Sequence, residues 1–174
     1  MIRILAISGS LRVNSANTQL LKIISGYATD ELEIKLYGGL GDLPHFNDAE
    51  KPPPAVLDLN TQIAEADGVL ICTPEYAFGI PGVLKNALDW TVGLGSFDKK
   101  PVGVITAALA GDKAHASILL VLTALSADVA EGATLLIPFI RSKMNSKGEI
   151  SDAPTSEAVK KLLNELQIKC ENKI

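Results

Sequence analysis

The sequence predicts an α/β protein, a three-layer sandwich in which five parallel strands form one sheet between two layers of helices. Two observations predict this class. Five short apolar runs recur along the chain, and segments with helical periodicity separate them. Most of these runs are apolar nearly throughout, as is typical of strands buried on both faces of a parallel sheet. With right-handed crossovers two strand orders are common at this size, and we favour 2-1-3-4-5.

The first half of the chain alternates two strands with two helices. An apolar run indicates the first strand, and the alternation of Leu32, Ile34 and Leu36 indicates a second, half-buried one. Many Gly, Asp and Pro residues then indicate a loop. The expected order is a strand at 2–7, a helix capped by Ser15 or Asn17, a strand at 31–37, a loop over 38–54 and a helix at about 55–66.

The second half continues the same alternation. Pro81 fits the first turn of a helix, and apolar residues at helical spacing follow it. Glu131 and Gly132 interrupt the last apolar run, so we expect the fifth strand to be split there. The expected order is strands at 68–73, 101–107 and 129–137, helices after Pro81 and at 112–125, a polar loop over 144–154 and an amphipathic helix at 155–170.

Length and composition suit a single domain over residues 1–174, because 47% apolar and 21% charged residues are ordinary for a globular protein. The net charge of −4 argues against nucleic acid or an anionic membrane as the main partner, since both attract positive surfaces. We recognise no signal peptide and expect a cytoplasmic protein. In a reducing compartment Cys72 is expected as a buried free thiol and Cys170 as an exposed one. His45 and His115 are isolated, so no metal site is expected.

The loop directly after the first strand has the composition of a phosphate site. Gly9 permits a tight turn, and the helix that follows offers N–H donors and a favourable dipole at its N-terminus. Arg12 adds a guanidinium, whose charge-assisted hydrogen bond contributes about 1.5–3 kcal/mol. Side-chain donors of suitable length are Ser10, Ser15, Asn17 and Thr18.

The spacing in this loop excludes two common nucleotide sites. The triphosphate pattern needs a second glycine and a lysine after Gly9, and both are missing. The dinucleotide pattern G-x-G-x-x-G fails because Leu11 and Asn14 stand where glycines are required. The remaining alternative to a phosphate site is a plain strand–helix turn with a polar cap and an incidental arginine.

The loop after the third strand has the chemistry of a rigid platform for a flat ring. Pro74 and Pro81 bracket it and restrict its backbone. Free N–H groups on such a backbone suit the polar edge of an isoalloxazine, and Tyr76 and Phe78 are placed to cover the ring or flank it. The alternative is a Pro-bounded turn whose aromatic residues pack on the sheet or on a neighbouring subunit. For Glu75 we favour a binding or structural role over catalysis.

Cys72, at the end of the third strand, raises a different chemistry, that of a cysteine phosphatase loop. That reaction needs an arginine six residues after the nucleophile, where this chain has Phe78, and Glu75 would repel a phosphate. The sequence therefore excludes a cysteine phosphatase.

Taken together, two motifs resemble the NADPH-dependent FMN reductase family, a flavodoxin-like family that includes chromate and quinone reductases and some azoreductases. The first motif reads Gly9-Ser10-Leu11-Arg12-x-x-Ser15-x-Asn17. The second, longer and more specific, reads Thr73-Pro74-Glu75-Tyr76-x-x-Gly79-x-Pro81-Gly82-x-Leu84-Lys85-Asn86-Ala87-x-Asp89-Trp90. The resemblance covers nearly the whole chain in the order of its elements.

The resemblance implies a flavodoxin-like sandwich that binds FMN beside the first and third strands. It also implies NADPH or NADH as electron donor and a homodimer or homotetramer that completes the active site. No side chain need act as acid, base or nucleophile, because the flavin carries the chemistry. The residues implied in cofactor binding are Ser10, Arg12, Ser15, Ala16 and Asn17 around the phosphate, and Pro74, Glu75, Tyr76, Ala77 and Phe78 along the ring.

The sequence departs from the family pattern at three places. Ala77 stands where many members have Asn after Glu-Tyr, which removes one side-chain contact. The loop over 106–111 keeps only Gly111 of a pattern usually rich in Ser and Gly, and the usual Leu-Arg pair of the next helix is replaced within 119–122.

We therefore expect an FMN-dependent NAD(P)H oxidoreductase that passes hydride from nicotinamide to flavin and on to a quinone-like, azo, metal-oxyanion or free-flavin acceptor. One alternative is a flavodoxin-type electron-transfer module without its own NAD(P)H activity, although flavodoxins generally carry a more acidic face than a net charge of −4 allows. The other is a flavin-free regulatory or scaffold protein with the same fold, which the presence of both loops disfavours.

Overall fold

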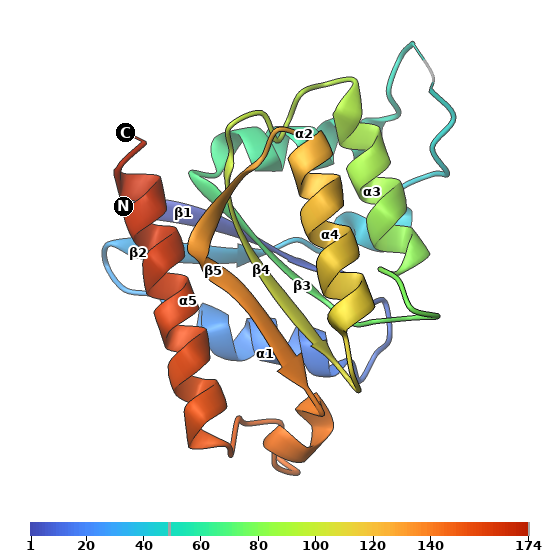
Figure 1. Ribbon diagram of the computed structural model, residues 1–174. Helices are drawn as coiled ribbons and strands as arrows, with labels where there is room; N and C mark the ends of the chain where they lie inside the picture. The colour runs from blue at the N-terminus through green and yellow to red at the C-terminus, as the bar shows by residue number, and fades with distance from the viewer. Residues whose placement is uncertain (49, 174) are drawn as a thin grey trace.

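The computed structural model of the chain describes residues 1–48 and 50–173, and they contain one five-stranded parallel sheet (Figure 1). Its order, β2-β1-β3-β4-β5, is the predicted one. Strands β3 and β4 are buried along their whole length, which explains their continuous apolar sequences. The bounds are Ile2–Ser8 for β1, Leu32–Leu36 for β2, Gly68–Thr73 for β3, Pro101–Ala108 for β4 and Asp128–Pro138 for β5.

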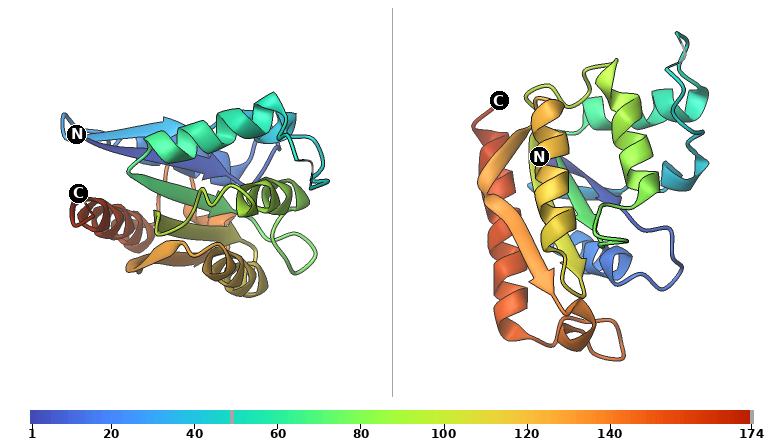
Figure 2. Two further views of the ribbon diagram at one scale, coloured as in Figure 1. Left: turned by 90° about the horizontal axis from the view of Figure 1, so that it is seen from above. Right: turned by 45° about the vertical axis from the view of Figure 1, so that its right-hand side comes forward.

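Helices cover both faces of this sheet (Figures 1 and 2). The apolar sides of α1 and α5 pack on one face, and those of α2, α3 and α4 pack on the other, so the sandwich has two separate apolar cores. The bounds are Ala16–Ser25 for α1, Pro54–Glu65 for α2, Gly82–Val92 for α3, Asp112–Ala124 for α4 and Ala153–Glu171 for α5, with short 3₁₀ helices η1 at Gly39–Asp42 and η2 at Ile140–Lys143.

Strand β5 is continuous, whereas the sequence predicted a split strand. Its pairing with β4 shifts register between Val102 and Val104, which pair with Val129 and Thr134. Residues 130–133 therefore bulge opposite a single residue of β4, and pairing resumes beyond them. Glu131 and Gly132 lie in this bulge, so the interruption in the apolar pattern marks an irregularity within the strand and not its end.

Two element boundaries also differ from expectation. The predicted loop over 38–54 contains η1, and α2 begins within it at Pro54. Helix α5 begins at Ala153, earlier than expected, because the Asp152 carboxylate accepts the Thr155 N–H at 3.0 Å and caps the helix. Pro154 then falls in the first turn, where its missing N–H costs nothing.

Cys170 is buried, although the sequence suggested an exposed thiol. Its side chain packs against Gly68, where an added Cβ would lie 2.5 Å from Cys170 Sγ. The absence of a side chain at Gly68 thus makes the space that buries the thiol on α5. Cys170 and Cys72 are both free, and no disulfide joins them.

Helix α3 holds the long loop that precedes α2. Asn86 Nδ2 donates to the Pro44 carbonyl at 3.0 Å, and Asn86 Oδ1 accepts the Phe46 N–H at 2.8 Å. Trp90 Nε1 also donates to Pro44 at 2.8 Å, and the Phe46 ring packs edge-on against the Trp90 ring. Asn86 and Trp90 both belong to the second sequence motif, so part of that motif serves to fix this loop.

None of the helices in the described part of the chain is both long enough and apolar enough to span a membrane.

Candidate functional site

The loops after β1, β3, β4 and β5 meet at one edge of the sheet. Ser8 pairs with Cys72 and Thr73 pairs with Thr106, so these strands end nearly level. Between their loops lies an open cleft of about 280 Å³. This edge of an open α/β sheet is where ligands bind in such folds. The cleft is lined by Arg12, Asn14, Ser15, Ala16, Asn17, Pro74, Glu75, Tyr76, Ala107, Ala108, Leu109, Phe139, Ile140 and Arg141.

The N-terminus of α1 forms one part of this cleft. Ser15 is the N-cap, and its Oγ accepts the Thr18 N–H at 3.4 Å. The backbone N–H groups of Ala16 and Asn17 have no acceptor within residues 1–48 and 50–173. Two uncommitted N–H groups at the positive end of a helix dipole make a site for an anion.

Ser10 connects the two loops that the sequence singled out. Its Oγ lies 3.2 Å from Tyr76 Oη and accepts the Arg12 N–H at 3.3 Å. The loops after β1 and β3 are therefore one connected structure, although 66 positions separate Ser10 from Tyr76. The Arg12 side chain itself is exposed, and no carboxylate in the described chain forms an ion pair with it.

The side chain of Asn17 points into the protein, although the sequence suggested it as a side-chain donor to phosphate. Its Nδ2 donates to the Ala107 carbonyl at 3.0 Å, and its Oδ1 accepts from Cys72 Sγ at 3.2 Å. Thr18 is engaged in the same way, with its Oγ1 2.8 Å from Ser8 Oγ. At this end of α1 the side chains of Asn17 and Thr18 fasten the helix to the sheet, so Asn17 offers a ligand its backbone N–H and not its side chain.

The loop after β3 turns sharply at its tip. Tyr76 and Gly79 exchange two backbone hydrogen bonds of 2.9 and 3.0 Å, and the residues between them, Ala77 and Phe78, both have positive φ, 49° and 60°. This is the backbone of a primed two-residue turn. Ala77 and Phe78 are not among the residues that line the cleft, so of the predicted ring contacts only Pro74, Glu75 and Tyr76 line it.

Glu75 caps a helix that belongs to another part of the chain. Its Oε2 accepts the N–H groups of Lys113 and Ala114 at 3.0 and 2.9 Å, at the start of α4. The N-cap position of that helix is Gly111, which has no side chain to accept them. The structural role considered from the sequence is confirmed for this side chain.

The sequence did not assign to the cleft the residues that follow β5. Phe139, Ile140 and Arg141 line it, as does Asn14 in the first loop. One signal was available, because a ligand at the carboxyl edge of a parallel sheet is reached by the residues directly after each strand. Arg141 follows the fifth strand by three residues and brings the second guanidinium of the cleft.

Two buried titratable groups near the cleft, Cys72 and His115, favour their neutral forms. Burial raises the pKa of the Cys72 thiol far above its ordinary value, so this sulfur stays protonated. His115 Nδ1 lies 2.9 Å from Thr106 Oγ1, and burial lowers the pKa of its imidazole below 6.5. Neither group is thus prepared to act as a charged nucleophile or acid at neutral pH.

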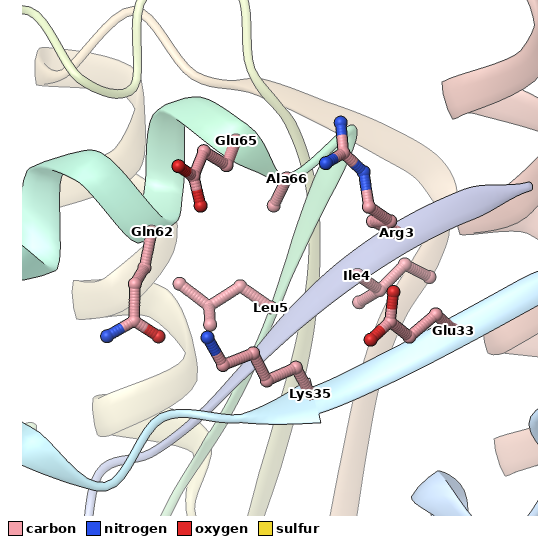
Figure 3. A pocket seen from close by; sticks show the side chains of 8 residues that line it. All are labelled: Arg3, Ile4, Leu5, Glu33, Lys35, Gln62, Glu65 and Ala66. Atoms are coloured by element: carbon pink, nitrogen blue, oxygen red, sulfur yellow. The ribbon is translucent and has the colours of Figure 1, made fainter.

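A second pocket lies on the face of the sheet that α2 covers, between α2 and the strands β1 and β2 (Figure 3). It has a volume of about 180 Å³, and its charged side chains are of both signs: Arg3 and Lys35 beside Glu33 and Glu65. Such a balanced set gives no preference for an anion or a cation. The pocket therefore differs from the first cleft, whose two guanidinium groups favour an anion.

Comparison with known proteins agrees with this geometry. The sequence profile described as NADPH-dependent FMN reductase matches residues 2–141. The chain belongs to this family. A quinone reductase of Escherichia coli K12 is 30% identical over 164 residues, covering 88% of this chain and 87% of its own. An NAD(P)H-dependent FMN reductase of Pseudomonas aeruginosa is 30% identical over 175 residues, covering 96% and 94%.

Among solved structures, the chain is similar to FerB, a flavoenzyme NAD(P)H:(acceptor) oxidoreductase from Paracoccus denitrificans. The TM-score is 0.86 at 29% identity, and the match covers 99% of this chain and 98% of FerB. As a member of the NADPH-dependent FMN reductase family, the chain is an NAD(P)H-dependent oxidoreductase with FMN as its cofactor.

The cleft fits FMN. The uncommitted N–H groups of Ala16 and Asn17, together with Arg12, supply what a phosphate monoester needs. Tyr76 and Leu109 add apolar surface suited to a flat ring. The described chain contains no cluster of three His, Cys, Asp or Glu side chains that would hold a metal ion.

Proposed function

We propose that this protein is an FMN-dependent NAD(P)H oxidoreductase that passes hydride from nicotinamide to the flavin and electrons on to a small-molecule acceptor. The observation that carries the proposal is the cleft itself, where an anion-binding helix N-terminus and a rigid, Pro-bounded loop face the same space. When bound, FMN supplies the redox chemistry. The acceptor is proposed to be quinone-like, with azo compounds, metal oxyanions and free flavin as further candidates.

The residues of the chain act by binding and orienting. The N–H groups of Ala16 and Asn17 and the guanidinium of Arg12 hold the phosphate, which fixes one end of the cofactor. The backbone from Pro74 to Tyr76 would hold the ring, and the hydrogen bond between Ser10 and Tyr76 fixes this loop relative to the loop after β1. The apolar side chain of Leu109, which lines the cleft, would border the ring.

No side chain is proposed as an acid, base or nucleophile. Glu75 is committed to the start of α4, and the Cys72 thiol is protonated and bonded to Asn17. The protein contributes by positioning the cofactor and by its electrostatics. The side chains of Glu75 and Cys72 serve this role by holding the loops of the cleft in place.

The quinone is the first acceptor to test, because relatives from Escherichia coli and Burkholderia are described as a quinone reductase and a 2-hydroxy-1,4-benzoquinone reductase. The decisive experiment is an absorbance spectrum of the purified protein, before and after anaerobic NADPH. Bound flavin that bleaches rapidly with NADPH alone and recovers on addition of a quinone supports the proposal. Bound flavin that NADPH leaves oxidised indicates a passive electron carrier, and protein that stays colourless with added FMN refutes an FMN site.

We further propose that the chain works as a single domain, in the cytoplasm, and as a homodimer or homotetramer. The exposed side chains of Phe78, Leu109 and Phe139 lie at or near the rim of the cleft and support an assembly that covers it. Light scattering of the purified protein measures the oligomeric state. If Phe78→Ser leaves that state unchanged, the tip of this loop is not part of the contact.

A further inference from the structure

Arg141 lies in η2, directly after β5, and lines the same cleft as Arg12. Its side chain is exposed, and no carboxylate of residues 1–48 and 50–173 forms an ion pair with it. Arg12 and Arg141 are the two cationic side chains among the residues that line the cleft. The carboxylate there, that of Glu75, is already bonded to α4. The cleft therefore holds two positive charges that nothing in the described chain neutralises.

The packing of η2 brings Arg141 close to the N-terminus of α1. Ile140, next to it, is only 4% exposed and belongs to the apolar core of α1, against which Ala16 packs. Further along, a Cβ at Gly148 would lie 3.3 Å from the side chain of Gln19 on α1. Figures 1 and 2 show η2 beside the end of α1 at which the helix begins.

The backbone around Arg141 is fixed as well. The Phe139 N–H donates to the Leu109 carbonyl at 3.1 Å, which ties the segment after β5 to the loop after β4. Ser142 donates its N–H to Phe139 at 2.9 Å and closes the turn. With Ile140 anchored in the core, the guanidinium extends from a defined position at the cleft.

A phosphate monoester carries a charge of about −1.5 to −2 at neutral pH, more than one guanidinium balances. We propose that Arg141 is a second phosphate-binding residue, which with Arg12 and the N–H groups of Ala16 and Asn17 holds the phosphate of FMN. This inference rests on the proposed function, because it places FMN in this cleft. Arg141, which follows β5, thereby joins a phosphate site whose other residues come from the loop after β1 and the start of α1.

The test compares FMN with riboflavin, which has the same ring and no phosphate. Dissociation constants are measured by flavin fluorescence with the flavin-stripped full-length protein, which avoids any turnover. For Arg141→Gln we expect FMN to bind about tenfold more weakly or worse, from the loss of one charge-assisted contact, while the affinity for riboflavin is unchanged. Arg141→Lys retains the positive charge, so its dissociation constant for FMN is expected to lie between those of the wild type and Arg141→Gln.

Lys143→Gln is the matched control, because Lys143 lies in the same 3₁₀ helix but does not line the cleft. It is expected to leave the preference for FMN over riboflavin at the wild-type value. Arg12→Gln serves as the positive control and is expected to reduce that preference. Circular dichroism of each variant shows whether it is folded.

Four results would overturn the inference. A folded Arg141→Gln variant with the wild-type preference for FMN shows that Arg141 does not contact the phosphate. Equal weakening of both flavins assigns it to the ring or to the support of the loop. A higher KM for NADPH, with unchanged KM for NADH and unchanged FMN binding, assigns it to the 2′-phosphate of the donor. Wild-type protein that binds neither flavin refutes the proposed function itself and this inference with it.

Discussion

At the scale of single residues, the turn formed by Ala77 and Phe78 is costly. Both residues adopt the left-handed conformation, which costs a non-glycine residue roughly 1–2 kcal/mol. Phe78 is in addition 81% exposed. Primed turns favour Asn and Gly at these positions. The Asn that many family members carry after Glu-Tyr is therefore the residue that this backbone prefers, independently of any contact with flavin.

Replacing Ala77 by Asn is expected to stabilise the protein. The free energy of unfolding should rise by about 0.5–1 kcal/mol, because Asn tolerates a positive φ better than Ala does. Ala77→Val should lower it, since a branched Cβ crowds the same backbone. Urea denaturation measures both. An unchanged midpoint for Ala77→Asn would contradict a left-handed turn at this position.

Gly9 is required by close packing, not by its backbone angles. A Cβ at this position would lie 2.8 Å from Thr73 Oγ1 and 3.0 Å from Leu84 Cδ2. Gly9→Ala should therefore displace the first loop, cost roughly 1–3 kcal/mol of stability and weaken FMN binding. Gly38→Ala is the control, because nothing lies within 4 Å of its added Cβ. Thermal unfolding and FMN titration of both variants test this requirement. If Gly9→Ala and Gly38→Ala have equal stability and equal affinity for FMN, close packing does not require glycine at position 9.

At the scale of elements, the capping of α4 by Glu75 ties the loop after β3 to N–H groups that lie 38 and 39 positions further along the chain. The sequence could not show this, because the cap comes from a distant loop and Gly111, the local N-cap, carries no side chain. The opposite holds for α1, whose cap Ser15 was one of the two candidates, with Asn17, that the sequence offered because they stand at the start of the predicted helix. Local hydrogen bonds are thus predictable from spacing, and tertiary ones are not.

Replacing Glu75 by Gln removes the charge but keeps an acceptor oxygen. We expect a loss of about 0.5–1 kcal/mol, from the weaker interaction with the helix dipole. Hydrogen exchange should show faster exchange at the amides of Lys113 and Ala114. Asp30→Asn is the control, because it removes an exposed carboxylate from the turn between α1 and β2. If hydrogen exchange at the amides of Lys113 and Ala114 is unchanged in Glu75→Gln, the charge of Glu75 does not stabilise the start of α4.

Strand β5 shows where element prediction from sequence reaches its limit. A break at Glu131 and Gly132 and a bulge produce the same interruption in an apolar pattern, because both take residues out of the alternation. The difference lies in whether pairing resumes, which depends on β4. The same strand continues to Pro138, one residue past its predicted end, and the residues of η2 that line the cleft follow directly.

At the scale of the whole molecule, stability is expected to fall as the pH drops below about 6.5. Burial lowers the pKa of His115 in the folded protein below its ordinary value of 6.5. At a pH between these two pKa values, His115 binds a proton in the unfolded chain but not in the folded one. The contribution of His115 is therefore complete above pH 6.5 and is lost towards lower pH. His115→Gln should reduce the difference in unfolding free energy between pH 7.5 and pH 5.5.

The control for this pH dependence is His45→Gln, which removes an exposed histidine from a surface loop. Chemical denaturation at the two pH values measures all three proteins. If the unfolding free energy differs as much between pH 7.5 and pH 5.5 in His115→Gln as in the wild type, groups other than His115 cause the acid sensitivity.

The strand order and the placement of the two loops at one edge followed from the sequence, because buried parallel strands have a distinct apolar signature and loops must follow their ends. The direction of individual side chains did not follow. Asn17 fastens α1 to β3 and β4, and Cys170 enters the core beside Gly68. Both outcomes depend on neighbours brought in by the fold, which spacing along the chain does not reveal.

The burial of both thiols has a practical consequence for spectroscopy. Cys72 and Cys170 are 0% and 1% exposed, so thiol reagents reach neither in the folded protein. A cysteine introduced by Val13→Cys would then be the thiol that a fluorophore or spin label modifies, because Val13 is 96% exposed between Arg12 and Asn14 of the cleft. The chain is thereby suited to single-site labelling beside its cleft with its native cysteines left in place.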